Sequence, residues 1–395
     1  MVRFSNTHLC VARGGKSGLA HPTLVHSELC SDALRKGEII LRVETFGFSA
    51  NNITYGLLGE HPHFRYFDFF HAPETASTSQ VSHGVIPVWG FGTVVATSHA
   101  TVRVGQRLYG YFAMSKYLVL QLDEQTNKYH VNVSLGKFGK DRRPYKQLTI
   151  CKTDPMYQKD REAEIMLYRP LFWTSYWFED WLYAKQYFGA HTVLVSSASS
   201  KTSFTVAYNI QRRKKTTGSL DVNVIGLTSP SNVQFTRSLG LYDGVFTYDE
   251  LDQVMMTVPS PHPLVYVDVL GNSSLNSRVN KVFSPSMFVP LGIDIWEDKT
   301  KTNVKGFFTP EWLAVRIAQL SPQQILEMQV EAWAALMKDC RKWVKIEKTY
   351  GLGNDGVQRY YWKTLEGKIA AEIGQAFSLW EESDVLDFQK GKAKL

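Results

Sequence analysis

The residues that decide the fold read Val193-Leu194-Val195-Ser196-Ser197-Ala198-Ser199-Ser200-Lys201-Thr202-Ser203. A short apolar run predicts a strand, the small residues after it predict a turn, and residues 204–210 predict a helix. In a strand-turn-helix unit the amides at the start of the helix point toward the turn and favour an anion there. The turn is therefore a candidate binding site for a pyrophosphate.

Serines stand in this turn where a dinucleotide-binding protein carries glycines. The pattern G-x-G-x-x-G falls on Ser197, Ser199 and Thr202, and a variant with gaps of three falls on Ser197, Ser200 and Ser203. Glycine normally provides unusual backbone angles or lets the phosphates approach closely. Whether the turn still binds a dinucleotide is the question on which the function depends.

Composition indicates a folded protein of two or perhaps three domains. The chain has 395 residues, of which 44% are hydrophobic and 21% are charged. The formal charge is +7, but the densest basic cluster is Arg212 to Lys215, and no basic stripe or known module is visible. We therefore expect no nucleic-acid partner.

Cysteine usage and hydropathy predict a cytoplasmic protein with no membrane partner. Cys10, Cys30, Cys151 and Cys340 are far apart and form no CxxC pair, which favours a reducing compartment. The first residues lack the apolar core of a signal peptide, and no apolar stretch is long enough to span a membrane.

Periodicity predicts a β-rich region followed by a parallel sheet. Residues 38–120 read as short strands between glycine-rich turns, whereas residues 173–289 contain apolar strands at 192–195, 222–227, 244–246 and 264–269 with helix-length segments between them. The charged segment 123–167 reads as an insertion. An amphipathic helix is expected over about 323–346.

Four stretches in order resemble the medium-chain dehydrogenase/reductase superfamily, in particular its zinc-free quinone oxidoreductase and enoyl reductase branch. They are residues 46–55, residues 87–94 with 104–110, residues 174–176, and the series 226–232, 238–243 and 267–271; residues 365–368 resemble the closing helix and strand. The serine-containing turn is also similar to that of a poorly characterised branch, a domain-of-unknown-function group, for which the resemblance implies no reaction.

The resemblance implies an α/β fold with a GroES-like β-rich catalytic domain and a Rossmann-type doubly wound parallel-sheet domain. The expected limits are residues 1–170 for the catalytic domain, 171–300 for the nucleotide-binding domain, and 301–395 for a segment that returns to complete the catalytic domain. By analogy with the family, a homodimer is expected.

Zinc is not expected. Zinc-dependent members of the family carry a His-Glu pair where this chain has Val88 and Trp89, neither of which can ligate a metal. His61, His63 and His71 lie in or beside an aromatic-rich loop, where histidines more often line a surface or pocket than bind a metal.

The residues after the second parallel strand favour NADP(H) over NAD. An NAD site usually has a carboxylate there for the ribose hydroxyls, whereas this chain has hydroxyls and an amide. Lys201 and the Arg212–Lys215 cluster add positive charge. The alternative is that Ser231 or Asn232 caps a helix and that Lys201 is solvated. The candidate cofactor-binding residues are Ser197, Ser199, Ser200, Lys201, Thr202, Ser203, Thr228, Ser229, Ser231, Asn232 and Thr174.

Tyr55, Asn52 and Thr54 are the candidate catalytic residues. The resemblance implies a tyrosine near this turn that can protonate the carbanion or enolate formed by hydride addition, while an amide can orient a carbonyl. The alignment slips by one residue, so Thr54 is the alternative to Tyr55, and a packing role for Tyr55 is equally open.

A non-redox function is the alternative. Ser199-Ser200-Lys201 could supply a nucleophilic serine with a lysine base for acyl hydrolysis or transfer, although the turn matches neither G-x-S-x-G nor S-x-x-K. A lyase or cyclase that uses the same fold is also open. Either way the crowded aromatic residues 172–181 favour a flat, conjugated or long apolar small molecule as substrate, unless they pack a helix.

Overall fold

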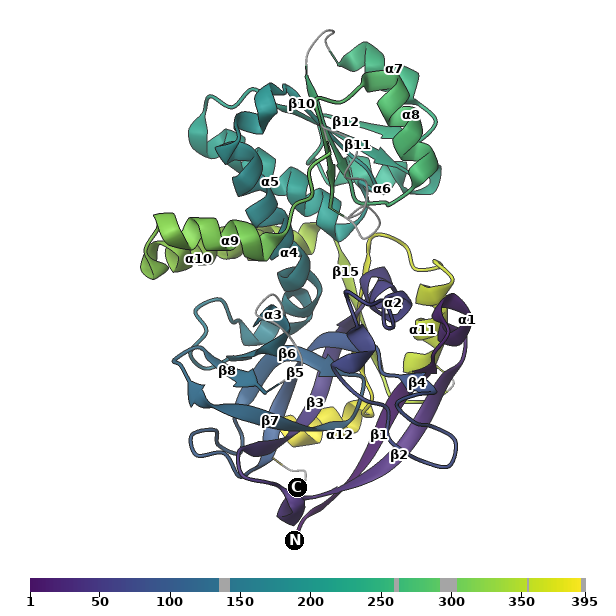
Figure 1. Cartoon of the computed structure of the whole chain (residues 1–395), viewed down its shortest axis with the longest axis vertical. Helices are drawn as coiled ribbons and strands as arrows, with labels where there is room; N and C mark the ends of the chain where they lie inside the picture. The colour runs from purple at the N-terminus through teal and green to yellow at the C-terminus, as the bar shows by residue number, and fades with distance from the viewer. Residues whose placement is uncertain (135–142, 259–262, 292–303, 354, 392–395) are drawn as a thin grey trace. The chain divides into compact units, whose positions relative to one another are not determined.

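A computed structural model describes residues 1–134, 143–258, 263–291, 304–353 and 355–391 (Figure 1). The chain divides into two compact units, one of residues 1–167 and 345–395 and the other of residues 168–344. Residues 301–344, which the sequence assigned to the catalytic domain, therefore belong to the second unit. The returning segment begins only at Lys345.

The first unit is built around a β-barrel. Strand β3 (Glu38–Phe48) pairs with both β5 (Pro87–Thr97) and β7 (Tyr117–Thr126), so six strands in the order β3-β5-β6-β9-β8-β7 close on themselves. The other barrel strands are β6 (Arg107–Ala113), β8 (His130–Val133) and β9 (Gln147–Ile150). Closure leaves inward side chains such as Leu41 and Val94 buried in one continuous core.

Further elements surround the barrel. Strands β15 (Lys345–Tyr350) and β16 (Ile373–Ser378) extend its sheet from β3, and β2-β1-β4 form a separate sheet. The remaining elements of this unit are β1 (Arg3–Ala12), β2 (Pro22–Cys30), β4 (His83–Gly84), α1 (Gly15–Leu19), α2 (Ala50–Leu57), α3 (Arg143–Lys146), α11 (Val357–Leu365) and α12 (Glu382–Gln389).

The segment 123–167 is mostly not the irregular insertion that its charge suggested. It supplies the end of β7 together with β8 and β9 to the barrel, and its last residues begin α4 (Glu162–Ala184). Burial alternates along β8, where Val131 and Val133 are buried and the polar His130 and Asn132 are half-buried, as in a strand with one face on the core. Residues 135–142 lie outside the described residues.

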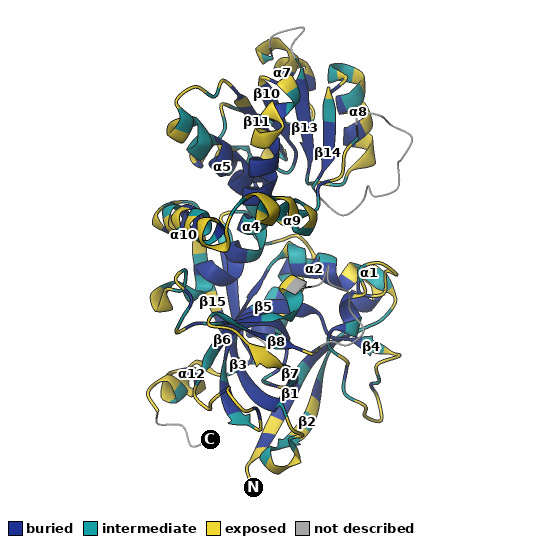
Figure 2. Ribbon diagram, turned by 60° about the vertical axis from the view of Figure 1, so that its left-hand side comes forward, coloured by how far each residue is buried: buried dark blue, intermediate teal, exposed yellow. Residues whose placement is uncertain are grey.

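The second unit contains the parallel sheet that the sequence predicted. Its five strands are β10 (Thr192–Val195), β11 (Asn223–Thr228), β12 (Gly244–Thr247), β13 (Leu264–Asp268) and β14 (Met287–Pro290). All pair in parallel, in the order β12-β11-β10-β13-β14. The central strands are buried along their length because helices cover the sheet (Figure 2). The four strands predicted at 192–269 are confirmed to within two residues.

Helices complete the second unit, and one of them is shorter than the sequence predicted. The helices are α4, which begins in the first unit, α5 (Lys201–Thr217), α6 (Val233–Ser238), α7 (Leu251–Thr257), α8 (Ser273–Phe283), α9 (Thr309–Gln319) and α10 (Pro322–Asp339). The helix expected over 323–346 ends at Asp339, because a 3₁₀ turn at Cys340–Lys342 follows and β15 begins at Lys345. In the sequence the helical spacing of apolar residues continues to Val344, but residues 340–344 lie outside α10.

Candidate functional site

The strand order places a candidate site at the carboxyl end of β10. From β10 the chain first moves outward to β11 and β12, and then returns to β13 on the other side of β10. Adjacent loops therefore leave β10 and β13 in opposite directions. In open parallel sheets such a reversal opens a crevice at the carboxyl ends of the strands, where ligands bind.

The turn after β10 keeps a glycine-like backbone although it has no glycine. Ser197 has a φ of 51°, in the left-handed region that favours glycine. The N–H of Ala198 donates to the carbonyl of Leu227 at 2.9 Å, which holds the turn against β11. Ser197 therefore adopts the left-handed backbone angle for which glycine is normally used.

The serine hydroxyls mostly bond within the turn. Ser200 is the N-cap of α5, and its hydroxyl accepts from the N–H of Ser203 at 3.3 Å and donates to the Ser203 hydroxyl at 2.9 Å. The Ser203 hydroxyl donates to the carbonyl of Ser196 at 2.8 Å. These two hydroxyls are therefore structural, and they replace glycine by tying the helix to the strand.

Two amides of the turn remain available. The N–H groups of Ser199 and Thr202 donate to no other residue among those that the structure describes. Both lie at the amino end of α5, where the helix dipole favours an anion. Lys201 lies between them, half-buried, and burial lowers its pKa to about 8. The arrangement can accept a phosphate.

A buried network that the sequence did not reveal braces this turn. The Asp268 carboxylate accepts from the Ser196 hydroxyl at 2.9 Å, from the Asn276 amide at 2.7 Å, and from the N–H groups of Leu270 and Gly271 at 3.0 Å. Asp268 is 1% exposed. The one available signal was an acidic residue directly after an apolar strand, at the position where the loops diverge.

The end of β11 lacks a carboxylate, as the sequence predicted. Thr228 is buried, and its hydroxyl has no hydrogen-bond partner among the described residues. The hydroxyls of Ser229 and Ser231 lie 3.1 Å apart, and Asn232 precedes α6 without a side-chain capping bond. The capping role considered for Ser231 or Asn232 is therefore not seen.

Two of the expected contributions to this site lie elsewhere. The Thr174 hydroxyl bonds to Pro170 on its own helix, whereas its neighbour Ser175 donates to the carbonyl of Thr202 at 2.9 Å. The Arg212–Lys215 cluster starts eleven residues after Lys201 on α5, roughly 17 Å along the helix. Three of its members bind acidic groups, through the pairs Arg212–Glu331, Arg213–Glu179 and Lys214–Asp243. This cluster is too far along α5 to serve the turn.

The candidate catalytic residues share one short helix of the first unit, so they and the cofactor candidates belong to different units. In α2 the Asn52 amide oxygen accepts from the N–H of Ser49 at 2.9 Å, and its nitrogen donates to the carbonyl of Pro87 at 3.1 Å. Asn52 thus caps α2 and ties it to β5. Thr54 is half-buried on the same helix.

Tyr55 lies buried among other aromatic rings. Its ring centroid is 4.5 Å from that of Tyr66 and 5.8 Å from that of Tyr111. Burial raises the pKa of the Tyr55 hydroxyl, and the nearby Tyr145 raises it further. A phenol with a raised pKa stays protonated at neutral pH and is a weaker acid, so Tyr55 can give its proton only to a strongly basic group such as a carbanion or enolate.

The histidine-containing loop shows no metal arrangement. His61 accepts from the N–H of His63 at 3.2 Å, and both rings pack against Phe64. Among the residues that the structure describes, no group of three or more His, Cys, Asp or Glu side chains could hold a metal ion.

The serine-lysine alternative is not favoured by the geometry. The Ser200 hydroxyl is committed to capping α5 through Ser203. A nucleophilic serine needs its hydroxyl within reach of a base and exposed to substrate. No observation on this turn supports acyl transfer.

The aromatic residues 172–181 pack within the second unit. Phe172 and Trp173 lie 5.7 and 5.8 Å from Trp333 of α10, and Phe178 lies 5.2 Å from Phe307. Helix packing therefore accounts for these rings, and they do not define a substrate.

Solved structures share this fold at low sequence identity. The CurK enoyl reductase is 16% identical with a TM-score of 0.52, over 94% of this chain and 99% of its own. CurA from Vibrio vulnificus in complex with NADPH is 13% identical with a TM-score of 0.52, over 95% and 99%. A mutant enoyl thioester reductase from Candida tropicalis is 11% identical with a TM-score of 0.53, over 95% and 100%. The chain therefore has the fold of these reductases.

Sequence comparisons add a family. No curated protein matches the chain in sequence. A family model described as "Protein of unknown function (DUF2855)" matches residues 46–370. No helix among the described residues is long and apolar enough to cross a membrane.

Proposed function

This chain belongs to the DUF2855 family of proteins of unknown function, and since that membership supplies no reaction, we propose from its site that it is a zinc-independent, NADPH-dependent reductase. Its substrate would be an apolar molecule with an activated double bond or carbonyl, such as an enone, a quinone or an enoyl thioester. In this proposal the β-rich unit is a GroES-like catalytic domain and the parallel-sheet unit is a Rossmann-type cofactor domain.

The observation that carries the proposal is the pair of available amides at the start of α5. The turn after β10, where the strand order reverses, carries the N–H groups of Ser199 and Thr202 and the side chain of Lys201. The hydroxyls of Ser200 and Ser203 bond within the turn and leave the two amides to a ligand. These residues would hold the pyrophosphate.

The preference for NADPH over NADH rests on the end of β11. A carboxylate there would repel the 2′-phosphate, and this chain has Ser229, Ser231 and Asn232 instead. The unpartnered Thr228 hydroxyl offers one more donor. The CurA structure, which has the same fold, was solved with NADPH, and this supports the assignment.

When bound, NADPH supplies the hydride. Tyr55 is the proposed proton donor, because its raised pKa keeps the phenol protonated until a carbanion or enolate forms nearby. Thr54 remains the second candidate for that role. Asn52 would act by holding α2 in place, since its amide is already bonded at both ends.

Cofactor binding tests the proposal directly. Titration of the full chain with NADPH is expected to quench tryptophan fluorescence with saturation, and NADH is expected to bind at least tenfold more weakly, since a matched phosphate contact is worth more than about 1.4 kcal/mol. The absence of saturable binding by either nucleotide would overturn the reductase assignment. Equal affinities would overturn the preference for NADPH.

The pH dependence of NADPH binding should report Lys201. Burial lowers the pKa of Lys201 to about 8, so its positive charge is largely lost as the pH rises from 7 to 9.5. The phosphates stay ionised over this range. The affinity is therefore expected to fall about fivefold to tenfold, measured by fluorescence titration. In Lys201→Met the affinity should be flat with pH, whereas Lys215→Met, an exposed position in the last turn of α5, should behave like the wild type; equal slopes in all three would contradict the assignment.

A further inference from the structure

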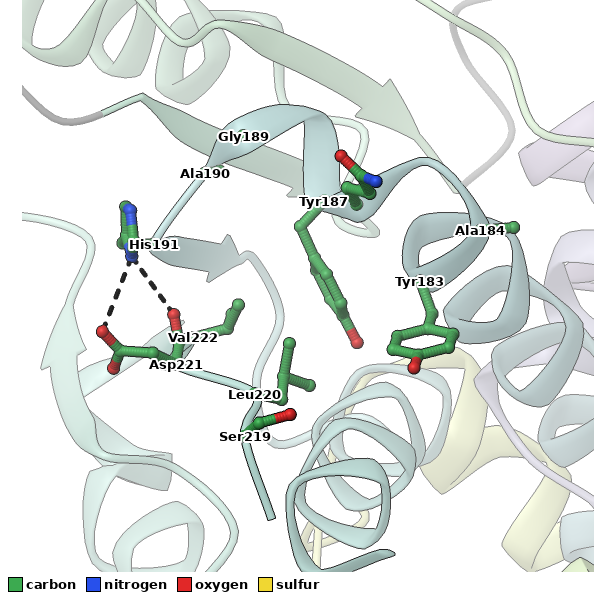
Figure 3. A pocket seen from close by; sticks show the side chains of 11 residues that line it. Tyr183, Ala184, Tyr187, Gly189, Ala190, His191, Ser219, Leu220, Asp221 and Val222 are labelled. Carbon is green, nitrogen blue, oxygen red and sulfur yellow. Dashed lines mark hydrogen bonds and ion pairs between the residues drawn. The ribbon is translucent and has the colours of Figure 1, made fainter. Parts of the chain in front are cut away.

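A pocket lies at the edge of the parallel sheet where β10 and β11 begin. It has a volume of about 540 Å³ and adjoins the first residues of β10 and β11, whereas the turn discussed above follows the end of β10 (Figure 3). Volumes of this size are typical of small-molecule sites. It is lined by Tyr183, Ala184, Gln186, Tyr187, Gly189, Ala190, His191, Ser219, Leu220, Asp221 and Val222.

One wall of the pocket has a strained backbone. Gln186, Tyr187 and Phe188 have φ values of 51°, 49° and 52°, so three consecutive residues other than glycine adopt the left-handed conformation, and Gly189 follows at 73°. This conformation is unfavourable for residues with a Cβ. Strain of this kind persists where the surroundings enforce it, and it is common at binding sites.

Buried contacts enforce the strained turn. Tyr187 is 1% exposed, and its hydroxyl donates to the Glu179 carboxylate at 2.7 Å. Glu179 in turn pairs with Arg213, whose Cζ lies 4.3 Å from the Tyr183 ring centroid. Phe188 packs edge-on against Trp181 at 5.2 Å. The wall is therefore preformed, which lowers the entropic cost of binding.

The electrostatic character of the pocket is negative. Helix α4 ends at Ala184 and α5 ends at Thr217, so two carbonyl ends with partial negative charge lie beside it. Asp221 is the one carboxylate among the lining residues, and its side chain is 90% exposed and lies 3.7 Å from His191 Nδ1. These groups oppose a phosphate and favour a cation.

The remaining lining is flat and apolar. Tyr183, which is 41% exposed, presents its ring, and Leu220 adds partly exposed aliphatic surface above the buried Tyr187, Ala190 and Val222. We propose that this pocket binds a small organic cation, an ammonium or amidinium group on a flat apolar body. The cationic group lies toward Asp221 and the helix ends, and the apolar body lies against Tyr183 and Leu220.

Binding of a simple probe tests this site without any nucleotide. Phenethylammonium is titrated into the full chain and followed by line broadening in proton NMR, with 2-phenylethanol as the neutral counterpart of the same shape. The ammonium compound is expected to bind saturably and about fivefold more tightly than the alcohol, as one exposed carboxylate allows. Equal binding of the two, or no saturable binding of the ammonium, would overturn the proposal.

Variants place the probe in this pocket. Asp221→Asn keeps the size and removes the charge, and it is expected to weaken phenethylammonium binding about fivefold. Leu220→Lys puts a cation beside the pocket and is expected to abolish binding. The matched control is Asp249→Asn, which removes an equally exposed carboxylate, 84% exposed and paired with Arg278, from the same unit. If Asp221→Asn binds like the wild type, or if Asp249→Asn loses as much affinity as Asp221→Asn, the site is refuted.

Discussion

Replacement of Thr202 by glutamate is expected to weaken NADPH binding about a hundredfold without destabilising the protein. Thr202 is the second residue of α5, and its N–H is one of the two available donors of the turn. A carboxylate a few ångströms from the pyrophosphate in a partly buried site costs about 3 kcal/mol, and each 1.4 kcal/mol is tenfold in affinity.

The same glutamate favours the helix. The first turn of α5 contains no acidic residue, and a negative charge there stabilises a helix by roughly 0.3–1 kcal/mol. The free energy of unfolding in urea should therefore be unchanged or slightly higher, which separates lost binding from lost folding. Thr202→Ser keeps the backbone donor without the charge and should bind NADPH like the wild type. If the glutamate variant binds NADPH normally, the pyrophosphate does not lie at this turn.

Replacement of Arg107 by methionine is expected to destabilise the β-rich unit by about 3–5 kcal/mol, because it leaves the buried carboxylate of Glu44 and the half-buried one of Glu162 unpaired. Arg107 Nη1 lies 2.8 Å from Glu44, and its other nitrogens bind both oxygens of Glu162 at 2.5 Å. Glu44 is 1% exposed and also accepts from the Thr93 hydroxyl at 2.6 Å. The ion pairs join β3, β6 and the first residue of α4.

Amide hydrogen exchange in β3 and β6 measures this loss in the unit concerned. Arg103→Met serves as the control, because Arg103 is exposed and precedes the same strand, and its side chain donates only to the carbonyl of Ala100 among the described residues. It should change the free energy by less than about 0.5 kcal/mol. A loss below about 1 kcal/mol in Arg107→Met would show that the cluster does not stabilise the barrel.

The local elements of this protein could be read from its sequence, and the partners of those elements could not. The apolar runs at 192–195 and 264–269 became β10 and β13. Their spacing, with helix-length segments between, was enough to predict a parallel sheet. In contrast, the hydrogen bond between Ser196 and Asp268 joins residues 72 positions apart. Neither segment carries a sequence pattern that identifies the other as its partner.

The misread regions have the same origin. Residues 123–167 looked irregular because the short strands β8 and β9 alternate polar and apolar residues over only four positions each, too few to show a period. Residues 323–346 kept an apolar spacing that continued past the end of α10. Both patterns are local, while the end of an element and the unit to which it belongs depend on what packs against it.

The sequence by itself determined the strand-turn-helix unit at residues 193–203, the absence of a carboxylate after β11, and the absence of metal-ligating side chains at Val88 and Trp89. These follow from residue type and near-neighbour spacing, which act over a few residues. Only the tertiary structure decided that Ser200 and Ser203 bond inward while the amides of Ser199 and Thr202 stay available, and that Asn52 caps α2. The direction of a hydrogen bond depends on the positions of both groups, which the chain acquires only when distant segments pack together.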